Sequence, residues 1–328
     1  ASEANELALR LAFTYTGRRD LIVLEGAYHG NTSTLIDISP YKHDGPGGMG
    51  APDWVHKAPV ADPFRGEYKY HDRDAGKKYA QYVEGIISDL KHKGRSPAAF
   101  IAETCPSVGG QIIFPQGYLA SVYKHIRAAG AVCIADEVQT AYGRMGSSFY
   151  AFEDQGVVPD IVVLGKPIGN GHPLAAVITT RDIASAFDNG MEFFSTFGGN
   201  TVSVAAGRKV LEIVLRDKYM KHAHETGSYL LDKLRTFKGK YPLVGDLRGS
   251  GLFLGIELVR DHDSLEPAGE EASYIAERMR ERRILLGTDG PYNNVLKIRP
   301  PMPFDRENAE ILADRLSDIF ENDPLISM

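Results

Sequence analysis

Two charged residues each follow an apolar run that has the composition of a buried strand. The first run, residues 131–135, leads into Asp136, and the second, residues 161–164, leads through Gly165 into Lys166. Open α/β sheets bind their ligands in the crevice beyond the carboxyl ends of the strands. We therefore expect a carboxylate and an ammonium group to lie near each other at that edge of a sheet.

This pair of groups has a recognisable chemistry. A lysine amine can form a Schiff base with an aldehyde, and a carboxylate can keep a pyridine nitrogen protonated so that the ring accepts electrons. Enzymes that use pyridoxal 5'-phosphate need both groups. The pattern predicts this cofactor, with Lys166 and Asp136 as catalytic residues. The alternatives are a surface lysine at a strand end and an aspartate that caps a helix.

The composition excludes several other classes of protein. The 328 residues are 43% apolar and 24% charged, as in ordinary globular proteins. The net charge of −6 comes without a basic tract, so neither nucleic acid nor a membrane is an expected partner. No metal site is expected. Cys105 and Cys133 both lie in apolar runs and are interpreted as buried free thiols, which indicates a cytoplasmic location.

Strand and helix patterns alternate along the first 200 residues, which predicts an α/β fold with a mostly parallel sheet. We expect helices at 3–16, 75–92 and 116–129, and strands at 21–25, 98–103, 131–135, 161–165 and 173–179. A Gly/Pro-rich stretch at 40–66 is predicted to be a loop that lines a site or an interface.

The pattern changes after residue 200. We expect helices at 201–217, 219–238, 270–283 and 306–321, and strands at 252–259 and 295–299. The prediction is a large cofactor-binding domain at 1–209 and a smaller α+β domain at 210–328.

Five motifs in order resemble the class III aminotransferases, a branch of the fold-type I pyridoxal phosphate enzymes. They are Ser2-Glu3-Ala4-Asn5, Tyr28-His29-Gly30-Asn31-Thr32, Asp136-Glu137-Val138-Gln139, Gly165-Lys166 and Ser195-Thr196-Phe197-Gly198-Gly199-Asn200. The match extends to Pro300-Pro301. The resemblance implies the fold-type I architecture, and the abrupt start of the chain in a helix implies that the N-terminal part of the family fold is absent.

The resemblance also implies roles for individual residues. Lys166 carries the Schiff base and shuttles the proton, and Asp136 faces the pyridinium nitrogen. Ser2, after Ala1, binds the cofactor phosphate at the N-terminus of a helix, where free N–H groups favour an anion. Tyr28 stacks on the cofactor ring, Gln139 hydrogen-bonds the ring hydroxyl, and His29 has a supporting role.

Thr196 resembles a threonine that reaches the cofactor phosphate of the neighbouring subunit. If this holds, the protein is a homodimer whose active sites are shared, although the sequence does not distinguish a dimer from a tetramer. Each role has an ordinary alternative: a helix cap for Ser2, a core tyrosine for Tyr28, a polar loop residue for Gln139 and a turn threonine for Thr196.

The chain departs from the common family pattern at the substrate contacts. In those aminotransferases an arginine three residues before the Pro-Pro pair grips the substrate carboxylate, and a glutamate neutralises it. Here the two positions hold Lys297 and Val108. A lysine without a competing carboxylate suits a phosphate group, because it is a compact point charge. Arg299 is a second candidate, and we expect only one of the two cations to serve, on the assumption that the strand turns them to opposite faces.

The segments 165–173, 289–291 and 294–298 resemble a subgroup, the ethanolamine-phosphate and phosphohydroxylysine phospho-lyases. The implied reaction eliminates phosphate from O-phosphoethanolamine and yields acetaldehyde and ammonia. Three alternatives stay open: phosphohydroxylysine as the substrate, an ω-aminotransferase that uses a keto acid, and a non-catalytic fragment that lacks its phosphate-binding segment.

Overall fold

The computed structural model describes residues 1–324 and 326, and it divides into two compact units. Unit 1 comprises 1–104, 114–142 and 150–217. Unit 2 comprises the chain from Lys218 onward together with two short segments, 105–113 and 143–149. The boundary predicted at 209/210 falls inside helix α7 (Thr201–Arg216), and the division follows Asp217.

Unit 1 is built on a six-stranded sheet with the strand order β2-β1-β3-β4-β5-β6. Its strands are β1 (Asp20–Leu24), β2 (Val55–Ala58), β3 (Pro97–Glu103), β4 (Val132–Asp136), β5 (Ile161–Leu164) and β6 (Ala176–Thr179). All neighbouring pairs are parallel except β5 and β6. The central strands are buried along their whole length, which explains why they appear in the sequence as continuous apolar runs. The predicted α/β class with a mostly parallel sheet is confirmed.

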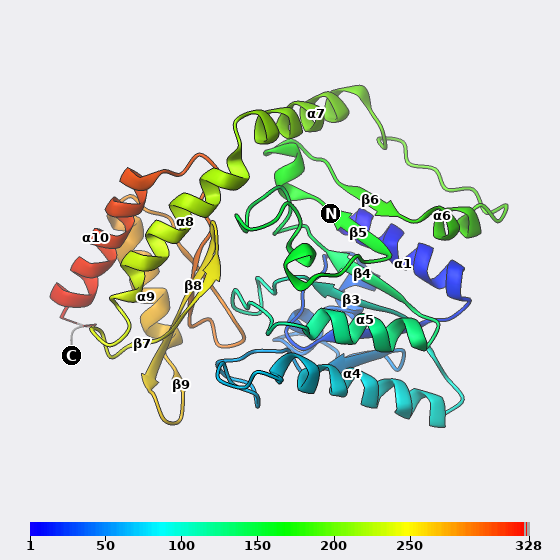
Figure 1. Ribbon diagram of the computed structural model, residues 1–328, viewed down its shortest axis with the longest axis horizontal. Coiled ribbons are helices and arrows are strands. Elements are labelled where there is room, and N and C mark those ends of the chain that lie inside the picture. The colour runs from blue at the N-terminus through cyan, green and yellow to red at the C-terminus, as the bar shows by residue number, and fades with distance from the viewer. Residues whose placement is uncertain (325, 327–328) are drawn as a thin grey trace. The chain divides into compact units, whose positions relative to one another are not determined.

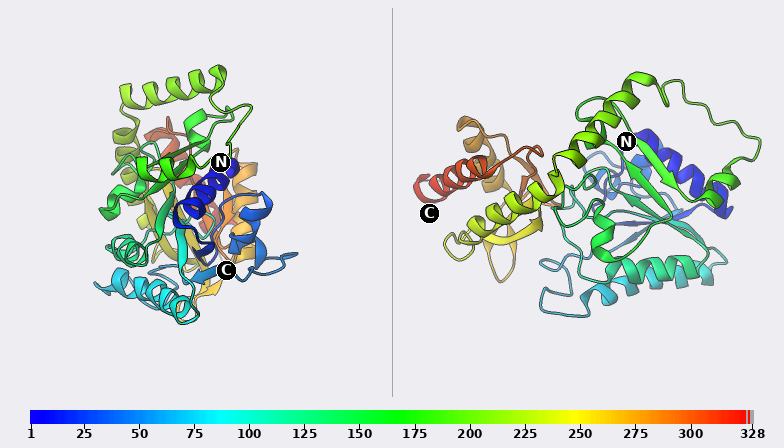
Figure 2. Two further views of the ribbon diagram at one scale, coloured as in Figure 1. Left: turned by 90° about the vertical axis from the view of Figure 1, so that its right-hand side faces the viewer. Right: turned by 45° about the horizontal axis from the view of Figure 1, so that its top comes forward.

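Helices cover both faces of this sheet (Figure 1). Helix α1 (Ser2–Thr16) packs Ala8, Leu9 and Ala12 against alternate residues of the central strands and ends at Gly17, whose φ of 66° closes the last turn. Helices α4 (Ala75–His92) and α5 (Tyr118–Ala128) lie beside each other on the face away from α1, as both views of Figure 2 show.

The prediction of one loop at 40–66 is wrong. The segment contains helix α3 (Pro40–His43) and the edge strand β2, which pairs in parallel with β1. Strand β2 was missed because it is short, Val-His-Lys-Ala, and flanked by glycines and prolines. Helices α2 (Ser33–Asp37) and α6 (Arg181–Phe187) and two 3₁₀ turns, Ala151–Gln155 and Lys166–Gly169, complete unit 1.

Unit 2 is an antiparallel sheet with three helices. The strand order is β10-β11-β8-β7, and β9 pairs with β8. The strands are β7 (Val244–Ser250), β8 (Phe253–Asp261), β9 (Glu266–Pro267), β10 (Gly287–Asp289) and β11 (Val295–Ile298). The helices are α8 (Tyr219–Arg235), α9 (Gly269–Glu281) and α10 (Arg306–Asn322).

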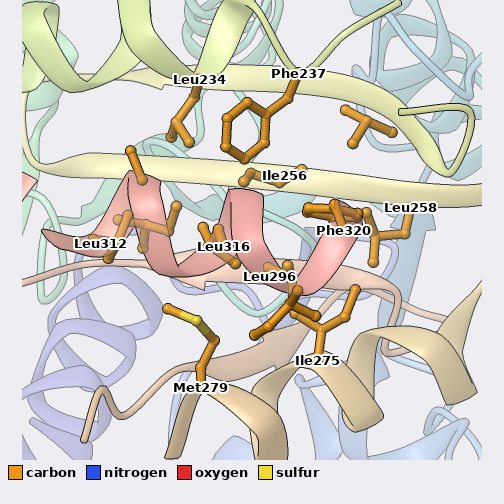
Figure 3. Close-up of a cluster of buried hydrophobic side chains, with 14 of the residues drawn as sticks. Leu234, Phe237, Ile256, Leu258, Ile275, Met279, Leu296, Leu312, Leu316 and Phe320 are labelled. Atoms are coloured by element: carbon orange, nitrogen blue, oxygen red, sulfur yellow. The ribbon is translucent and has the colours of Figure 1, made fainter. Parts of the chain in front are cut away.

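One apolar core joins the sheet of unit 2 to its helices (Figure 3). Leu296 of β11 and Ile256 of β8 meet Leu316 of α10, and all three are fully buried. Burying each of these side chains stabilises the fold by about 1.5–3 kcal/mol. Because Leu296 and Ile298 face this core, Lys297 between them lies on the other face of the strand.

The cysteines and the hydropathy of the helices can be compared with the expectations from composition. Cys105 and Cys133 are buried and neither forms a disulfide, as predicted, and burial raises the pKa of Cys133 well above its usual value. Within residues 1–324 and 326, no helix combines the length and the apolar composition that crossing a membrane requires.

Candidate active site

The two catalytic candidates lie at the carboxyl edge of the sheet of unit 1. Asp136 is the last residue of β4, and Lys166 comes two residues after the end of β5, the next strand in the sheet. The strands run parallel, with Asp136 opposite Val163. The sequence-predicted convergence of the two residues on one edge therefore agrees with the geometry.

The Asp136 carboxylate is buried and held by three donors. Its Oδ2 accepts a hydrogen bond from Asn5 Nδ2 at 3.0 Å and lies 2.9 Å from His29 Nδ1. Its Oδ1 accepts one from the backbone N–H of Val138 at 3.2 Å. His29 Nε2 is buried without a partner, so we assign the imidazole proton to Nδ1, where it is donated to Asp136. The carboxylate is thus fixed in direction by donors that need no charge of their own.

Lys166 stands on a strained turn. Its φ of 41° is in the left-handed region, which non-glycine residues occupy at a cost of about 1–3 kcal/mol and mostly at functional sites. At the preceding position only glycine fits, because a Cβ at Gly165 would lie 2.7 Å from Ala1 Cβ. The turn leaves the lysine side chain exposed.

A cavity of about 950 Å³ within unit 1 brings Lys166 together with the start of helix α1. Ser2 lies on its wall, as does His172, whose Nε2 is 2.8 Å from Ser203 Oγ. Helix α1 has no side-chain cap at its N-terminus, so its first N–H groups are available to an anion. Ser2 Oγ accepts from the backbone N–H of Asn31 at 3.2 Å, which leaves its own proton to donate.

Gly30 opens the space beside Ser2. A Cβ at this position would come within 2.7 Å of Ser2 Oγ and 2.4 Å of Leu35 Cδ1. The free N–H groups, the hydroxyl and the missing Cβ together form a cradle that suits a phosphate group.

Two further predicted contacts fit an aromatic cofactor. Gln139 is buried, and its Oε1 has no partner, as expected of an acceptor for a ring hydroxyl. The half-buried Tyr28 ring packs edge-on against Tyr41, with 6.0 Å between the ring centroids. Lys42 Nζ lies 5.8 Å from the centroid of the Tyr28 ring. With Asp136 and Lys166, these groups match the ring nitrogen, hydroxyl, aldehyde and phosphate of pyridoxal 5'-phosphate.

Thr196 does not join this group within one chain. It is exposed, and it is not on the wall of the cavity that holds Ser2 and Lys166. Its neighbours Phe194 and Phe197 are 76% and 80% exposed. Its assignment to a neighbouring subunit's cofactor stays a prediction.

The substrate candidates lie in unit 2. Lys297 Nζ is 2.8 Å from Asp289 Oδ2 and 3.0 Å from Asp289 Oδ1. The sequence-based premise of a lysine without a competing carboxylate is therefore wrong. The carboxylate comes from β10 and not from position 108, and this pairing requires the register of β10 and β11, which the sequence alone does not reveal.

Arg299 is held in the same unit. Its Nη1 lies 3.3 Å from Ser107 Oγ. Burial, and then the positive charge of Arg299, lowers the pKa of Arg144 to about 10, so the two guanidinium groups are close enough to repel each other. Arg144 donates to the backbone carbonyls of Leu252 and Pro300, which agrees with a structural role.

Lys297 and Arg299 also share a cavity of about 580 Å³, whose wall includes Arg283 and Arg315 but no acidic residue. The assumption that the two candidates point to opposite faces is wrong, because residues two apart along an extended chain share a face. Because Lys297 is paired with Asp289, an anion can bind its ammonium group only by displacing that carboxylate.

Two residues had no assigned part in the sequence analysis. Asn5 belongs to a quoted motif, but its bond to Asp136 appears only when α1 is packed on the sheet. Gln111 donates from Nε2 to Asp289 Oδ2 at 2.9 Å, and it lies in the 105–113 segment that folds with unit 2. Neither contact has a signal in the sequence.

Comparison with known proteins gives a consistent result. The family model described as aminotransferase class-III matches residues 1–320. An alanine–glyoxylate aminotransferase 2-like protein of Drosophila melanogaster is 48% identical over 94% of the chain, and the chain spans 64% of its length. Ethanolamine-phosphate phospho-lyase homolog 1 of Caenorhabditis elegans is 42% identical over 94% of the chain, which spans 68% of it.

A solved structure is also similar throughout. A phospholyase from Arthrobacter in complex with phosphoethanolamine superposes with a TM-score of 0.91 at 36% identity. The match covers 98% of this chain and 76% of that one. Fold, family model and relatives agree: the chain belongs to the class III aminotransferases, which have the fold-type I architecture and use pyridoxal 5'-phosphate.

Proposed function

We propose that the protein is a phospho-lyase that eliminates phosphate from O-phosphoethanolamine. The products are acetaldehyde, ammonia and phosphate, with one water consumed. The observation that carries the proposal is that Lys297 and Arg299 both line one cavity of unit 2, whose wall holds no acidic residue among the described residues. A phosphate group is a dianion near neutral pH and suits several cations.

The similarity to a phospholyase bound to phosphoethanolamine supports the same substrate class. So does the relative named as an ethanolamine-phosphate phospho-lyase homolog. Phosphohydroxylysine, which carries the same leaving group on a longer amine, is the alternative substrate.

The residues of unit 1 would hold the cofactor and move the proton. Bound pyridoxal 5'-phosphate supplies an electron sink for bond breaking at the carbon next to the substrate nitrogen. Lys166 takes the proton from that carbon. Asp136, held by Asn5 and His29, keeps a negative charge at the cofactor's ring nitrogen. Ser2 and the first N–H groups of α1 anchor the cofactor phosphate.

Unit 2 would bind the group that leaves. Lys297 and Arg299 stabilise the charge that develops on the phosphate oxygen as the carbon–oxygen bond breaks. Phosphate is a better leaving group than hydroxide, so elimination can outrun the reprotonation that amino transfer requires.

The test is a reaction of the full-length protein with pyridoxal 5'-phosphate and O-phosphoethanolamine in the absence of a keto acid. The proposal predicts equal amounts of inorganic phosphate and acetaldehyde. Amino-acid formation from a keto acid, without phosphate release, would contradict it.

The second candidate is a class III ω-aminotransferase. The name of the Drosophila relative favours it, and so does the Lys297–Asp289 ion pair, because a neutralised cation tolerates donors that lack an anionic group. An assay with alanine as donor and glyoxylate as acceptor distinguishes the two reactions through glycine formation.

We also propose a homodimer with Thr196 at the shared site, on the basis of the exposed Phe194 and Phe197 beside it. Light scattering on the purified protein gives the assembly size. A cytoplasmic location is proposed because Cys105 and Cys133 are buried and form no disulfide. Two relatives are named as mitochondrial, so the mitochondrion is the alternative, and fluorescence microscopy of a tagged protein distinguishes the two locations.

A further inference from the structure

The ion pair between Lys297 and Asp289 has a geometry that suits exchange of partners. Both Asp289 oxygens lie within 3.0 Å of Lys297 Nζ. Among the described residues, Asp289 is the only carboxylate that pairs with this lysine. The side chains of Lys297 and Asp289 are 25% and 10% exposed, so the pair is partly shielded but reachable from solvent.

The strand register places the two side chains on one face. Lys297 pairs with Gly287 and Val295 pairs with Asp289 in the antiparallel β10–β11 ladder, so Lys297 and Asp289 are diagonal neighbours. Gly287, opposite Lys297, contributes no side chain, and a Cβ there would already lie 3.7 Å from Lys297 Cε. The lysine therefore has room to reach either its partner or a ligand.

Asp289 is held by a second contact that does not depend on the lysine. Gln111 Nε2 donates to Asp289 Oδ2 at 2.9 Å, and the same amide lies within reach of Ser107 O and Oγ at 3.0 and 3.1 Å. The backbone N–H of Gly290 donates to the carbonyl of Val108 at 2.9 Å, which ties the end of β10 to the same segment. Because of these contacts, Asp289 keeps its position when Lys297 moves away from it.

We propose that Asp289 is a displaceable counter-ion that sets the specificity of the substrate site. It neutralises Lys297 when no anionic group is bound, and the phosphate of the substrate competes with it for the ammonium group. The carboxylate is supplied by Asp289 of β10, whose position opposite β11 is set by the strand register. The inference rests on the proposed binding of the substrate's anionic group by Lys297.

The Lys297–Asp289 ion pair affects which ligands bind at this site. A ligand without an anion leaves the ion pair intact, whereas an anionic ligand must pay for breaking it. Removing the charge of Asp289 should therefore favour anionic ligands and leave Lys297 uncompensated beside neutral ones.

The test measures binding of inorganic phosphate to the protein loaded with pyridoxal 5'-phosphate, so that the cofactor's own phosphate site is filled. Titration calorimetry compares the wild type with Asp289→Asn, which keeps the shape of the side chain. We expect the phosphate dissociation constant to fall about tenfold, the size of one charge-assisted contact. Lys297→Met should abolish the gain when combined with Asp289→Asn.

Two controls separate charge from structure. Asp289→Glu keeps the charge and should retain a dissociation constant within about threefold of the wild type. Asp232→Asn removes a negative charge from an exposed pair with Arg235 in α8 and should leave phosphate binding unchanged. Thermal melting of each variant reports on folding.

Unchanged or weaker phosphate binding in a folded Asp289→Asn variant would overturn the inference, because Asp289 would then position Lys297 and not compete for it. Failure of the proposed reaction has a different signature. Tighter phosphate binding by Asp289→Asn, with no phosphate released from O-phosphoethanolamine, would sustain the counter-ion and refute the phospho-lyase.

Discussion

Asp136 of unit 1 and Asp289 of unit 2 each end a strand and are each largely buried, yet their surroundings differ in charge. Asp136 is 4% exposed, and its partners are an amide, an imidazole and a backbone N–H. Asp289 is paired with the ammonium group of Lys297 and accepts one hydrogen bond from Gln111.

The difference indicates what each carboxylate can do. An amide, an imidazole and a backbone N–H fix the direction of Asp136. No lysine or arginine is among these three donors, so its negative charge is left for a cationic ligand such as a ring nitrogen. The charge of Asp289 is neutralised within the protein by Lys297, so an anionic ligand can bind Lys297 only by displacing Asp289. The first arrangement suits a permanent cofactor, and the second suits a substrate that comes and goes.

The largest effect is expected at Lys166, which moves the proton in the proposed mechanism. Lys166→Ala should lower the elimination rate by about 10³-fold or more, because general acid–base catalysis alone contributes about 10²–10⁴-fold. Phosphate release measured over hours gives the rate. A rate within tenfold of the wild type would remove Lys166 from the mechanism.

The comparison predicts the next largest effect at Asp136. Asp136→Asn keeps the shape and the contact with the Val138 N–H but removes the charge, and kcat should fall by about 10²–10³-fold, as for other preorganised electrostatic groups. Cofactor content, measured by absorbance after gel filtration, should stay near one per chain. If kcat is kept, the charge of Asp136 has no part in the chemistry.

Substitutions of the two cations in unit 2 should act on the Michaelis constant. Lys297→Met and Arg299→Met each remove a charged contact worth about 1.5–3 kcal/mol, so KM for O-phosphoethanolamine should rise about 10- to 100-fold. The variant with the larger rise identifies the main phosphate ligand. Equal and small changes in both would place the phosphate elsewhere.

Substitutions of His29 test whether an uncharged N–H donor to Asp136 is sufficient for catalysis. His29→Asn retains an N–H near the Nδ1 position, whereas His29→Leu has similar bulk and no donor. We expect kcat to fall about tenfold in His29→Leu and to be largely kept in His29→Asn, the size of one hydrogen bond to a charged group. Nitrogen NMR of the wild type should show the proton on Nδ1, and a doubly protonated ring would contradict the assignment.

The smallest effect is expected at Tyr28. Tyr28→Leu removes ring stacking worth about 0.5–1.5 kcal/mol, so the dissociation constant of pyridoxal 5'-phosphate should rise by about 2- to 10-fold. Tyr28→Phe is the matched control and should bind as the wild type does. An equally large rise of the dissociation constant in Tyr28→Phe would show that the hydroxyl group, and not ring stacking, contributes to cofactor binding.

The sheet of unit 1 was predictable because its central strands are buried on both faces. Strands β3, β4 and β5 appear as uninterrupted apolar runs, and their carboxyl ends placed Asp136 and Lys166 at one edge. Strand β2 escaped prediction because an edge strand of four residues with one charged side chain has no such signal.

Strand β7 was hidden for a different reason. Its Asp246 and Arg248 are buried, and Arg248 pairs with Asp246 and with Glu257 of β8. Charged residues in a sequence indicate a surface, and only the folded ladder shows that they neutralise one another. The Lys297–Asp289 pair has the same origin, since the partner is fixed by strand register and not by spacing along the chain.

The most direct test of the contrast between the two aspartates is a comparison of kcat and KM for O-phosphoethanolamine in His29→Leu and Asp289→Asn. The account predicts that His29→Leu lowers kcat with little change in KM, whereas Asp289→Asn lowers KM with little change in kcat. A change in the same parameter in both variants would contradict the assignment of a fixed carboxylate to the cofactor and an exchangeable one to the substrate.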